Sequence, residues 1–155
     1  MVKIYIPKYE DLWFREKLLS DPDTMSYNNA WGGTIDFPES KWQIWYHYWV
    51  ENSEGKRLYR YLIDENNNFV GEIAYHLDEI ENRYLVNVII YSKYRGNGYG
   101  REGLKLLCCL AKNNGLRILY DSVALDNSAI NLFLDCGFTE DYRTKDIVML
   151  KKDLE

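Results

Sequence analysis

A strand, a glycine-rich turn and a helix follow one another in the middle of the chain, and this succession constrains the fold most. Residues 84–91 are almost continuously apolar, which is typical of a strand buried in the centre of a sheet. Residues 95–101 contain three glycines, and residues 100–113 then repeat apolar side chains at helical spacing. The chain must therefore build a sheet that is packed against helices.

The rest of the chain supplies further strands and helices. Alternating apolar residues predict strands, apolar residues three or four apart predict helices, and Gly, Pro and Asn clusters predict turns. We expect strands at residues 2–6, 58–64, 69–77, 84–91, 118–125 and 147–150, helices at residues 9–19, 38–49, 100–113 and 126–135, and a long loop at residues 20–38.

This order of elements, β-α-α-β-β-β-α-β-α-β, predicts an α+β fold. No linker, repeat or low-complexity stretch divides the sequence, so residues 1–155 are expected to form a single domain. A chain of 155 residues can bury about 70% of its unfolded surface, which is enough for a core without disulfides or metals.

The composition excludes several classes of protein. The longest apolar run, residues 104–111, contains Lys105, so nothing approaches the roughly 20 uncharged residues that span a bilayer. The N-terminus lacks the apolar stretch of a secretory signal, so we expect a cytoplasmic protein with no membrane partner. Three cysteines, two of them adjacent, match neither a disulfide framework nor a zinc spacing, and no metal site is expected.

The net charge of −5 is distributed unevenly along the chain. Between residues 91 and 117, six bases face one acid, which makes a block of +5 in an otherwise acidic sequence. A local block of this kind favours a small anionic ligand, whereas proteins that bind nucleic acid usually carry a positive face over the whole domain. No nucleic acid is therefore expected as a partner, and an ordinary solvated helix face is the alternative explanation of the block.

The segment Arg95–Arg101 has the composition of a phosphate-binding turn. Glycines let the main chain approach an anion closely, and the free N–H groups and dipole of the following helix attract negative charge. A P-loop would need a Gly-Lys-Ser/Thr ending, and a dinucleotide fingerprint belongs in the first strand-turn-helix unit, so neither motif fits. A tight turn without a ligand remains the alternative.

Two motifs in this sequence resemble signatures of the GNAT superfamily of N-acetyltransferases. Arg95, Gly98 and Gly100 match its acetyl-CoA signature, Arg/Gln-x-x-Gly-x-Gly/Ala after the fourth strand. Residues 126–138 match a second signature, in which Asn-x-x-Ala precedes an aromatic residue and Gly-Phe. The resemblance covers residues 1–151 and implies a three-layer fold whose mixed, mostly antiparallel sheet is splayed between its fourth and fifth strands.

The resemblance also implies acetyl-CoA (coenzyme A) as the cofactor. Similar enzymes bind its pyrophosphate on the main chain of residues 96–101 and its pantetheine arm along residues 88–90, where a backbone N–H stabilises the oxyanion. Asp126 stands where the family usually has asparagine, with Asn127 beside it. The residues expected to bind the cofactor are Val88, Ile89, Ile90, Arg95, Gly96, Asn97, Gly98, Tyr99, Gly100, Arg101, Asp126, Asn127 and Phe133.

Direct acyl transfer to an amine needs a base for the amine and a proton for the departing thiolate. Glu72 is the first candidate for the base, because the third to fifth strands surround the acetyl group in the family. Asp121 stands where relatives that acetylate protein N-termini keep a catalytic glutamate, and both residues could instead be structural. Phe133 occupies the position of the tyrosine that usually donates this proton. The donor could instead be Tyr91, Tyr94, Tyr99 or a water, or no acid is needed because a thiolate is a tolerable leaving group. Of these tyrosines, we include Tyr91 among the expected catalytic residues.

The family's acceptor site is lined by the first two helices and the loop between them. That segment is rich in aromatic and acidic residues, which together suit a cationic amine, although the helix aromatics also suit core packing. The expected substrate residues are Tyr27, Trp31 and Asp36.

The resemblance therefore implies an acetyl-CoA-dependent N-acetyltransferase in which a primary amine attacks directly. The acceptor is expected to be a small cationic amine, an aminoglycoside-like amine or a peptide amine. The alternative, favoured by Phe133, is a catalytically weak or inactive acyl-CoA-binding sensor or interaction domain. A homodimer is compatible with either function.

Overall fold

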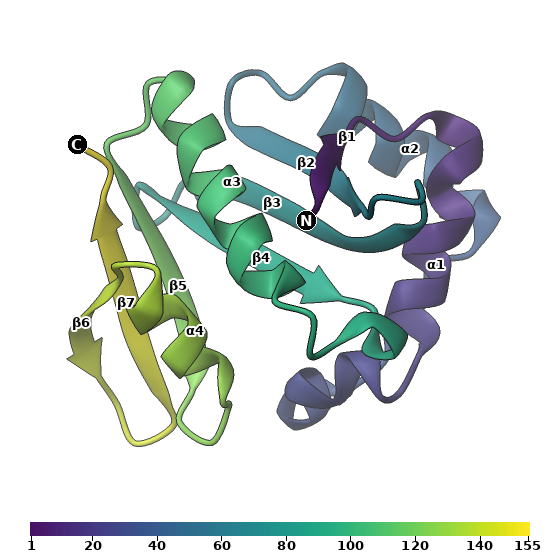
Figure 1. Cartoon of the computed structure of the whole chain (residues 1–155). Helices are drawn as coiled ribbons and strands as arrows, with labels where there is room; N and C mark the ends of the chain where they lie inside the picture. The colour runs from purple at the N-terminus through teal and green to yellow at the C-terminus, as the bar shows by residue number, and fades with distance from the viewer.

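The computed structural model describes residues 1–155 except for the side chain at position 30. Its strands form a single sheet in the order β1-β2-β3-β4-β5-β7-β6 (Figure 1). The strands are β1 (Lys3–Tyr5), β2 (Arg57–Ile63), β3 (Phe69–Asp78), β4 (Arg83–Ile90), β5 (Ile118–Ala124), β6 (Thr139–Arg143) and β7 (Ile147–Asp153). The α-helices are α1 (Leu12–Ser20), α2 (Trp42–Tyr46), α3 (Tyr99–Asn113) and α4 (Ala129–Asp135).

Shorter helical turns complete the chain. They are the 3₁₀ turns η1 (Tyr9–Asp11), η2 (Thr24–Trp31), η3 (Glu39–Lys41) and η5 (Ser92–Tyr94), and the π-helical turn η4 (His47–Glu51). Because η3, α2 and η4 are continuous, they form the expected tryptophan-rich helix, with a changing helical pitch. Among the helices that the structure describes, none combines the length and the apolar character needed to cross a bilayer.

The mixed sheet and its helices confirm the expected fold class, with two corrections to the element order. Residues 139–143 form a seventh strand that the sequence analysis missed, because this edge strand is exposed throughout and has no apolar alternation. The expected loop at residues 20–38 is also wrong in part, since residues 24–31 form the 3₁₀ turn η2.

The two faces of the sheet pack against different helices. Residues of α3 and α4, such as Leu104 and Phe133, form one core with alternate residues of the strands. Residues of α1, such as Phe14, form the second core on the opposite face, against the tryptophans of α2 and η4. Side chains of β4 alternate between the two, with Val88 in the first core and Ile89 in the second. The fold is therefore a three-layer helix-sheet-helix arrangement.

The sheet opens between β4 and β5. These strands are parallel and are paired only where Leu85 faces Tyr120. By contrast, β4 pairs with β3 along its whole length, from Arg83 to Ile90. Beyond Leu85 and Tyr120 the two strands diverge, as Figure 1 shows, and leave a gap at their carboxyl ends.

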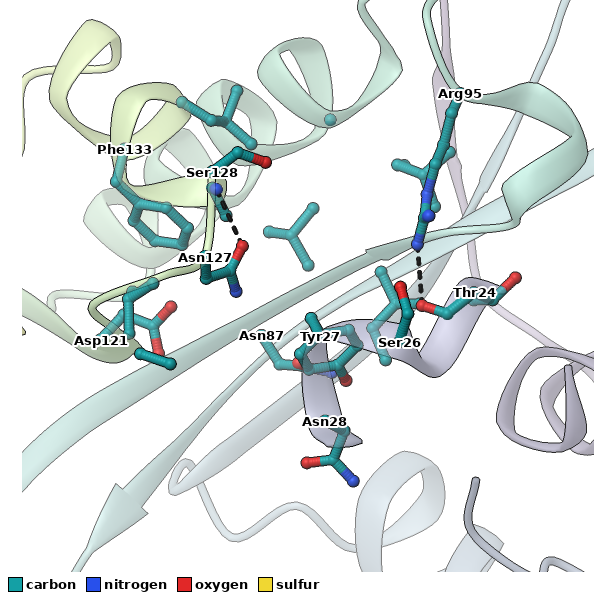
Figure 2. A pocket seen from close by; sticks show the side chains of 18 of the residues that line it. Thr24, Ser26, Tyr27, Asn28, Asn87, Arg95, Asp121, Asn127, Ser128 and Phe133 are labelled. Atoms are coloured by element: carbon teal, nitrogen blue, oxygen red, sulfur yellow. Dashed lines mark hydrogen bonds between the residues drawn. The ribbon is translucent and has the colours of Figure 1, made fainter. Parts of the chain in front are cut away.

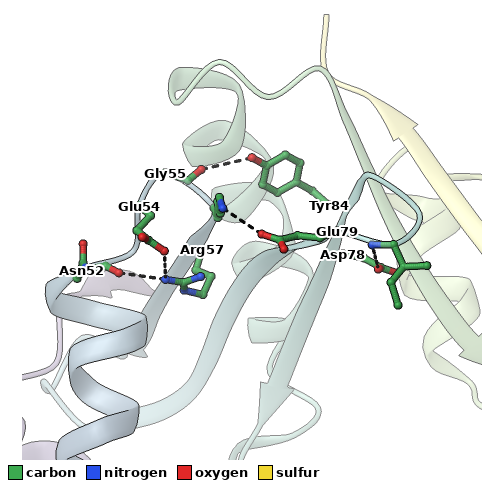
Figure 3. A network of polar contacts seen from close by, with 9 residues as sticks. Asn52, Glu54, Gly55, Arg57, Asp78, Glu79 and Tyr84 are labelled. Carbon is green, nitrogen blue, oxygen red and sulfur yellow. Dashed lines mark hydrogen bonds and ion pairs between the residues drawn. The ribbon is translucent and has the colours of Figure 1, made fainter.

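A polar network ties η4 to the start of β2 and to the β3–β4 hairpin (Figure 3). The buried Arg57 guanidinium donates to the carbonyl oxygens of Tyr48 and Asn52, at 3.0 and 3.1 Å, and stacks on the Tyr48 ring. Lys56 Nζ lies 3.0 Å from a Glu79 carboxylate oxygen on the hairpin. Arg57 therefore satisfies carbonyls at the end of η4 that would otherwise lack partners.

Gly71 on β3 should be the glycine of the core that is least tolerant of alanine. A Cβ there would overlap the Ile89 carbonyl oxygen on β4, so the two strands would have to separate. A Cβ at Gly103 on α3 meets Leu62 Cδ1 at 2.6 Å, and this is a side chain that can move. We expect Gly71→Ala to cost roughly 3 kcal/mol in urea unfolding and Gly103→Ala about 1 kcal/mol or less. Equal midpoints for the two variants would contradict this account of β3–β4 packing.

Candidate active site

A cavity of about 980 Å³ occupies the gap between β4 and β5 (Figure 2). Residues 87–90 of β4 and residues 121–124 of β5 form its two strand walls. The turn 94–101 with the start of α3, the segment 126–133 with the start of α4, and η2 close its other sides. The cavity therefore lies where the two motifs of the sequence analysis meet.

Free backbone N–H groups line the α3 end of the cavity. Gly98 is the N-cap of α3, with φ +80°, and no side chain caps the helix. None of the N–H groups of residues 96–101 has a hydrogen-bond acceptor among the described residues. These donors and the positive end of a 15-residue helix suit a phosphate group, and the open turn would admit one without contact with a Cβ.

Backbone groups of β4 also point into the gap. Tyr91 N–H donates to the Val70 carbonyl of β3 at 2.9 Å. Because consecutive residues of a strand alternate, the N–H groups of Val88 and Ile90 point away from β3, toward β5. This side of β4 can therefore pair with an extended ligand and place an N–H beside a carbonyl oxygen. The intervening Ile89 directs its N–H toward β3, although it also lines the cavity.

The α4 wall is formed by residues of the second motif. Phe133 is buried and packs edge-to-face on Phe138 with the ring centroids 5.0 Å apart, so it offers the cavity an apolar ring and no proton. Asn127 Oδ1 accepts the Ala129 N–H at 2.9 Å, just before the start of α4. The neighbouring Asp126 lines the cavity rim and is exposed.

The wall formed by η2 is anchored to the phosphate-binding turn. Ser92 N–H donates to Thr24 Oγ1 at 2.9 Å, and Ser92 Oγ donates to Asp21 Oδ2 at 2.6 Å. The Arg95 guanidinium donates to the carbonyl oxygens of Asp23 and Thr24 at 3.1 and 2.8 Å. Arg95 thus connects the turn to η2.

Two of the six bases in the +5 block, Arg95 and Arg101, line the cavity. Arg101 forms an exposed ion pair with Asp135 at 2.9 Å. Since both guanidinium groups already have protein partners, the free N–H groups of residues 96–101 are the stronger anion donors.

Asp121 is the carboxylate that borders the cavity from β5, beside Phe133 in Figure 2. Desolvation by burial raises the pKa of Asp121 well above its ordinary value, and the hydrogen bond from the Ser122 backbone N–H offsets only part of this. A carboxyl group whose pKa is raised by burial is a candidate for proton exchange with a ligand.

Glu72 lies beneath the cavity floor, 1% exposed, in a polar cluster that does not include Asp121. Its Oε1 accepts from Arg15 Nη1 and from the Tyr59 hydroxyl, both at 2.6 Å, and its Oε2 accepts from Asn87 Nδ2 at 3.1 Å. Burial is the largest single effect on the pKa of Arg15 and lowers it, but attraction to and hydrogen bonds with Glu72 and Tyr59 together outweigh burial, and the net shift is upward. Glu72 is therefore the counter-ion of a buried arginine and does not line the cavity.

The other expected site residues divide into two groups. Tyr27 and Trp31 of η2 line the cavity, and burial raises the pKa of Tyr27 to about 12, so its hydroxyl stays protonated at neutral pH. The remaining three expected residues, Tyr91, Asp36 and Asn97, lie outside the cavity. Tyr91 packs against Phe14 with the ring centroids 6.3 Å apart, and Asp36 is exposed. The Asn97 side chain donates to the Tyr94 carbonyl oxygen.

Sequence reasoning missed several residues of the cavity wall. Asn87 is the polar residue in the apolar run 85–90, and that contrast is a signal that could have identified it. Thr24, Ser122 and Ser128 carry no such signal, because small polar residues in turns and strand ends are common.

Comparisons with known proteins agree with this geometry. The model of the acetyltransferase (GNAT) family matches residues 11–138. The chain is 31% identical over 91 residues to an N-acetyltransferase of Haemophilus influenzae that acts on an alanine of ribosomal protein bS18. That match covers 59% of this chain and 62% of the relative's length.

Solved structures share the fold at low sequence identity. Spermidine N-acetyltransferase from Vibrio cholerae, solved with CoA and spermine, superposes with a TM-score of 0.82 at 18% identity. An acetyltransferase of the GNAT family from Bacillus anthracis superposes with a TM-score of 0.78, also at 18% identity. Each of these matches covers 99% of this chain and 95% of the other.

Proposed function

The chain belongs to the acetyltransferase (GNAT) family, and we propose that residues 1–155 act as one N-acetyltransferase domain that uses acetyl-CoA. The observation that carries the proposal is the row of free N–H groups of residues 96 and 98–101 at one end of the cavity. They would hold the pyrophosphate, and the unpaired side of β4 at Val88 and Ile90 would hold the pantetheine arm. Acetyl-CoA supplies the acetyl group as an activated thioester.

Residues of the two strands then take separate roles in the transfer. The N–H of Val88 is placed to bond the carbonyl oxygen as it gains negative charge. Asp121 removes the proton of the acceptor amine, directly or through a water, while the nitrogen–carbon bond forms and the carbon–sulfur bond breaks. The thiolate leaves and is protonated by solvent, since a thiolate is a tolerable leaving group and Phe133 has no hydroxyl.

The charge of the cavity wall favours a peptide amine as the acceptor. The residues of η2 that line the cavity are all uncharged: Thr24, Ser26, Tyr27, Asn28, Asn29 and Trp31. A polyamine carries several ammonium groups and is bound best by several carboxylates. The cavity is lined by two carboxylates, Asp121 on β5 and Asp126 at the exposed rim, and the wall formed by η2 carries none. This arrangement suits a single amine attached to a peptide, and the H. influenzae relative acts on an alanine of a protein.

Thiol release from acetyl-CoA tests this function. The assay uses an alanine-initiated peptide without lysine, the same peptide with an acetylated N-terminus as control, and spermidine. We expect kcat/KM for the free peptide to exceed that for spermidine at least tenfold, and no stimulation by the blocked peptide. Coenzyme A binding in calorimetry without stimulation by any amine would instead support an acyl-CoA-binding sensor or interaction domain.

A further inference from the structure

Asn87 connects the buried cluster around Glu72 to the cavity. It lies on β4 and lines the cavity, and its Nδ2 donates to Glu72 Oε2 at 3.1 Å. Tyr27 of η2 lines the same cavity, and Figure 2 draws both side chains. Because Asn87 interrupts an apolar strand, its amide needs a role that an apolar residue could not fill.

The cluster determines which atom of the Asn87 amide faces Glu72. Glu72 forms a buried ion pair with Arg15 at 2.6 Å, and the Arg15 guanidinium carbon lies 4.5 Å from the centre of the Trp45 ring and 5.1 Å from that of Phe37. An ionised carboxylate only accepts hydrogen bonds, so the Asn87 NH₂ group must face it. The amide oxygen, Oδ1, is then directed away from Glu72.

The Oδ1 atom of Asn87 is available to a ligand. No donor among the described residues bonds it. Among the described residues, the buried side-chain polar atoms that lack a partner are Arg15 Nε and Arg83 Nε. Asn87 Oδ1 lacks a partner but is not one of these buried atoms, so it is accessible to solvent. Since Asn87 lines the cavity, its free acceptor is exposed there.

Asn87 and Asp121 approach the gap from opposite faces of the sheet. By strand alternation Asn87 shares the face of Ile89, which packs in the core with α1. Asp121 shares the face of Leu119 and Val123, which pack in the core with α3 and α4. Both residues line the cavity between β4 and β5, one from each face of the sheet.

We propose that Asn87 Oδ1 binds the reacting amine of the acceptor, with its amide oriented by Glu72 and Arg15. The inference rests on the proposed function and adds a contact for the nucleophile. A neutral primary amine has two N–H groups: one is retained in the product amide and donates to Asn87 Oδ1, and the other gives its proton to Asp121. A secondary amine has a single N–H, which is the one it must lose, so it cannot make the contact with Asn87.

The test combines Asn87→Ala with two peptides that begin with alanine or with N-methylalanine. For the wild type we expect kcat/KM to be about tenfold lower with the N-methyl peptide, in addition to any steric loss. For Asn87→Ala, turnover of the alanine peptide should fall about tenfold, and the ratio between the two peptides should shrink by the same factor. Coenzyme A affinity, measured by calorimetry, should change less than twofold.

Two further variants keep the test decisive. Asn87→Leu has a side chain of similar size without a hydrogen-bonding group and should behave as Asn87→Ala does. If one of the two variants folds poorly, the other still provides the test. Asn114→Ala removes another asparagine whose Nδ2 donates to one core side chain, the Tyr75 hydroxyl at 2.9 Å, and lies outside the cavity, so its peptide ratio should match the wild type. An unchanged peptide ratio in both Asn87 variants of an active enzyme overturns the inference alone. A wild type that no amine stimulates overturns the proposed function as well.

Discussion

Replacing Gly98 with aspartate is expected to weaken the binding of coenzyme A at least a hundredfold. Gly98 precedes α3 with φ +80°, and no atom lies within 4 Å of the position of its Cβ. Aspartate tolerates this left-handed conformation better than most residues, so the fold should persist. Its carboxylate would stand where the phosphates are proposed to bind, and two such charges about 4 Å apart repel by roughly 4 kcal/mol near a protein surface.

Two matched variants separate charge from backbone strain. Gly98→Asn has the same shape without the charge and should lose less than about tenfold in affinity. Gly115→Asp introduces the same charge at another left-handed glycine, φ +87° with no atom within 4 Å, at the far end of α3, and should leave the affinity unchanged. Calorimetric titration of all three decides the point, and an affinity of Gly98→Asp within threefold of the wild type would reject the phosphate site.

Asp121→Asn is expected to lower kcat between about 10²- and 10⁴-fold, because it removes the proposed base while keeping its shape. The base acts as a carboxylate, and its pKa is raised, so the rate of the wild type should rise with pH through that pKa and then level off. The variant should lack this rise. Asp153→Asn, on the exposed end of β7, serves as control and should keep the wild-type profile.

Asp121→Asn, which should lower activity, is expected to raise stability relative to the wild type as the pH increases. Since folding raises the pKa of Asp121, the native state holds the proton more tightly than the unfolded chain. The wild type therefore loses stability as pH rises from the unfolded value, about 4, to the native pKa. Asp121→Asn stays neutral, so its melting temperature relative to the wild type should increase between pH 4 and pH 9. A constant difference would mean that the Asp121 pKa is not shifted.

The parts of the fold that could be predicted from the sequence are those specified by residues close together in the chain. The strand 84–91, the turn and the helix 100–113 are consecutive in sequence, and the structure has β4, the turn and α3 there. The 3₁₀ turn η2 has no such pattern, because it depends on Ser92 and Arg95, about 70 residues away in the sequence. Edge strand β6 is polar throughout and is defined by its pairing with β7.

The candidate site divides in the same way. The phosphate-binding turn is a single segment with unusual composition, so sequence could indicate it. The role of Glu72 depends on its ion pair with Arg15, which lies 57 residues earlier in the sequence. The sequence of β3 alone does not indicate this partner. Glu72 and Asp121 are similar as strand carboxylates in the sequence, and only the structure distinguishes the partnered one from the one that borders the cavity.

The gap between β4 and β5 gives this sheet two interior edges in addition to those at β1 and β6. Such edges present unpaired N–H and C=O groups, which natural proteins usually cover to prevent strand addition by another chain. In the proposed function the ligand itself provides this cover, since an extended arm along β4 would pair the groups that β5 leaves open. We therefore expect the ligand-free protein to be more prone to aggregation through its sheet than the protein with the site occupied.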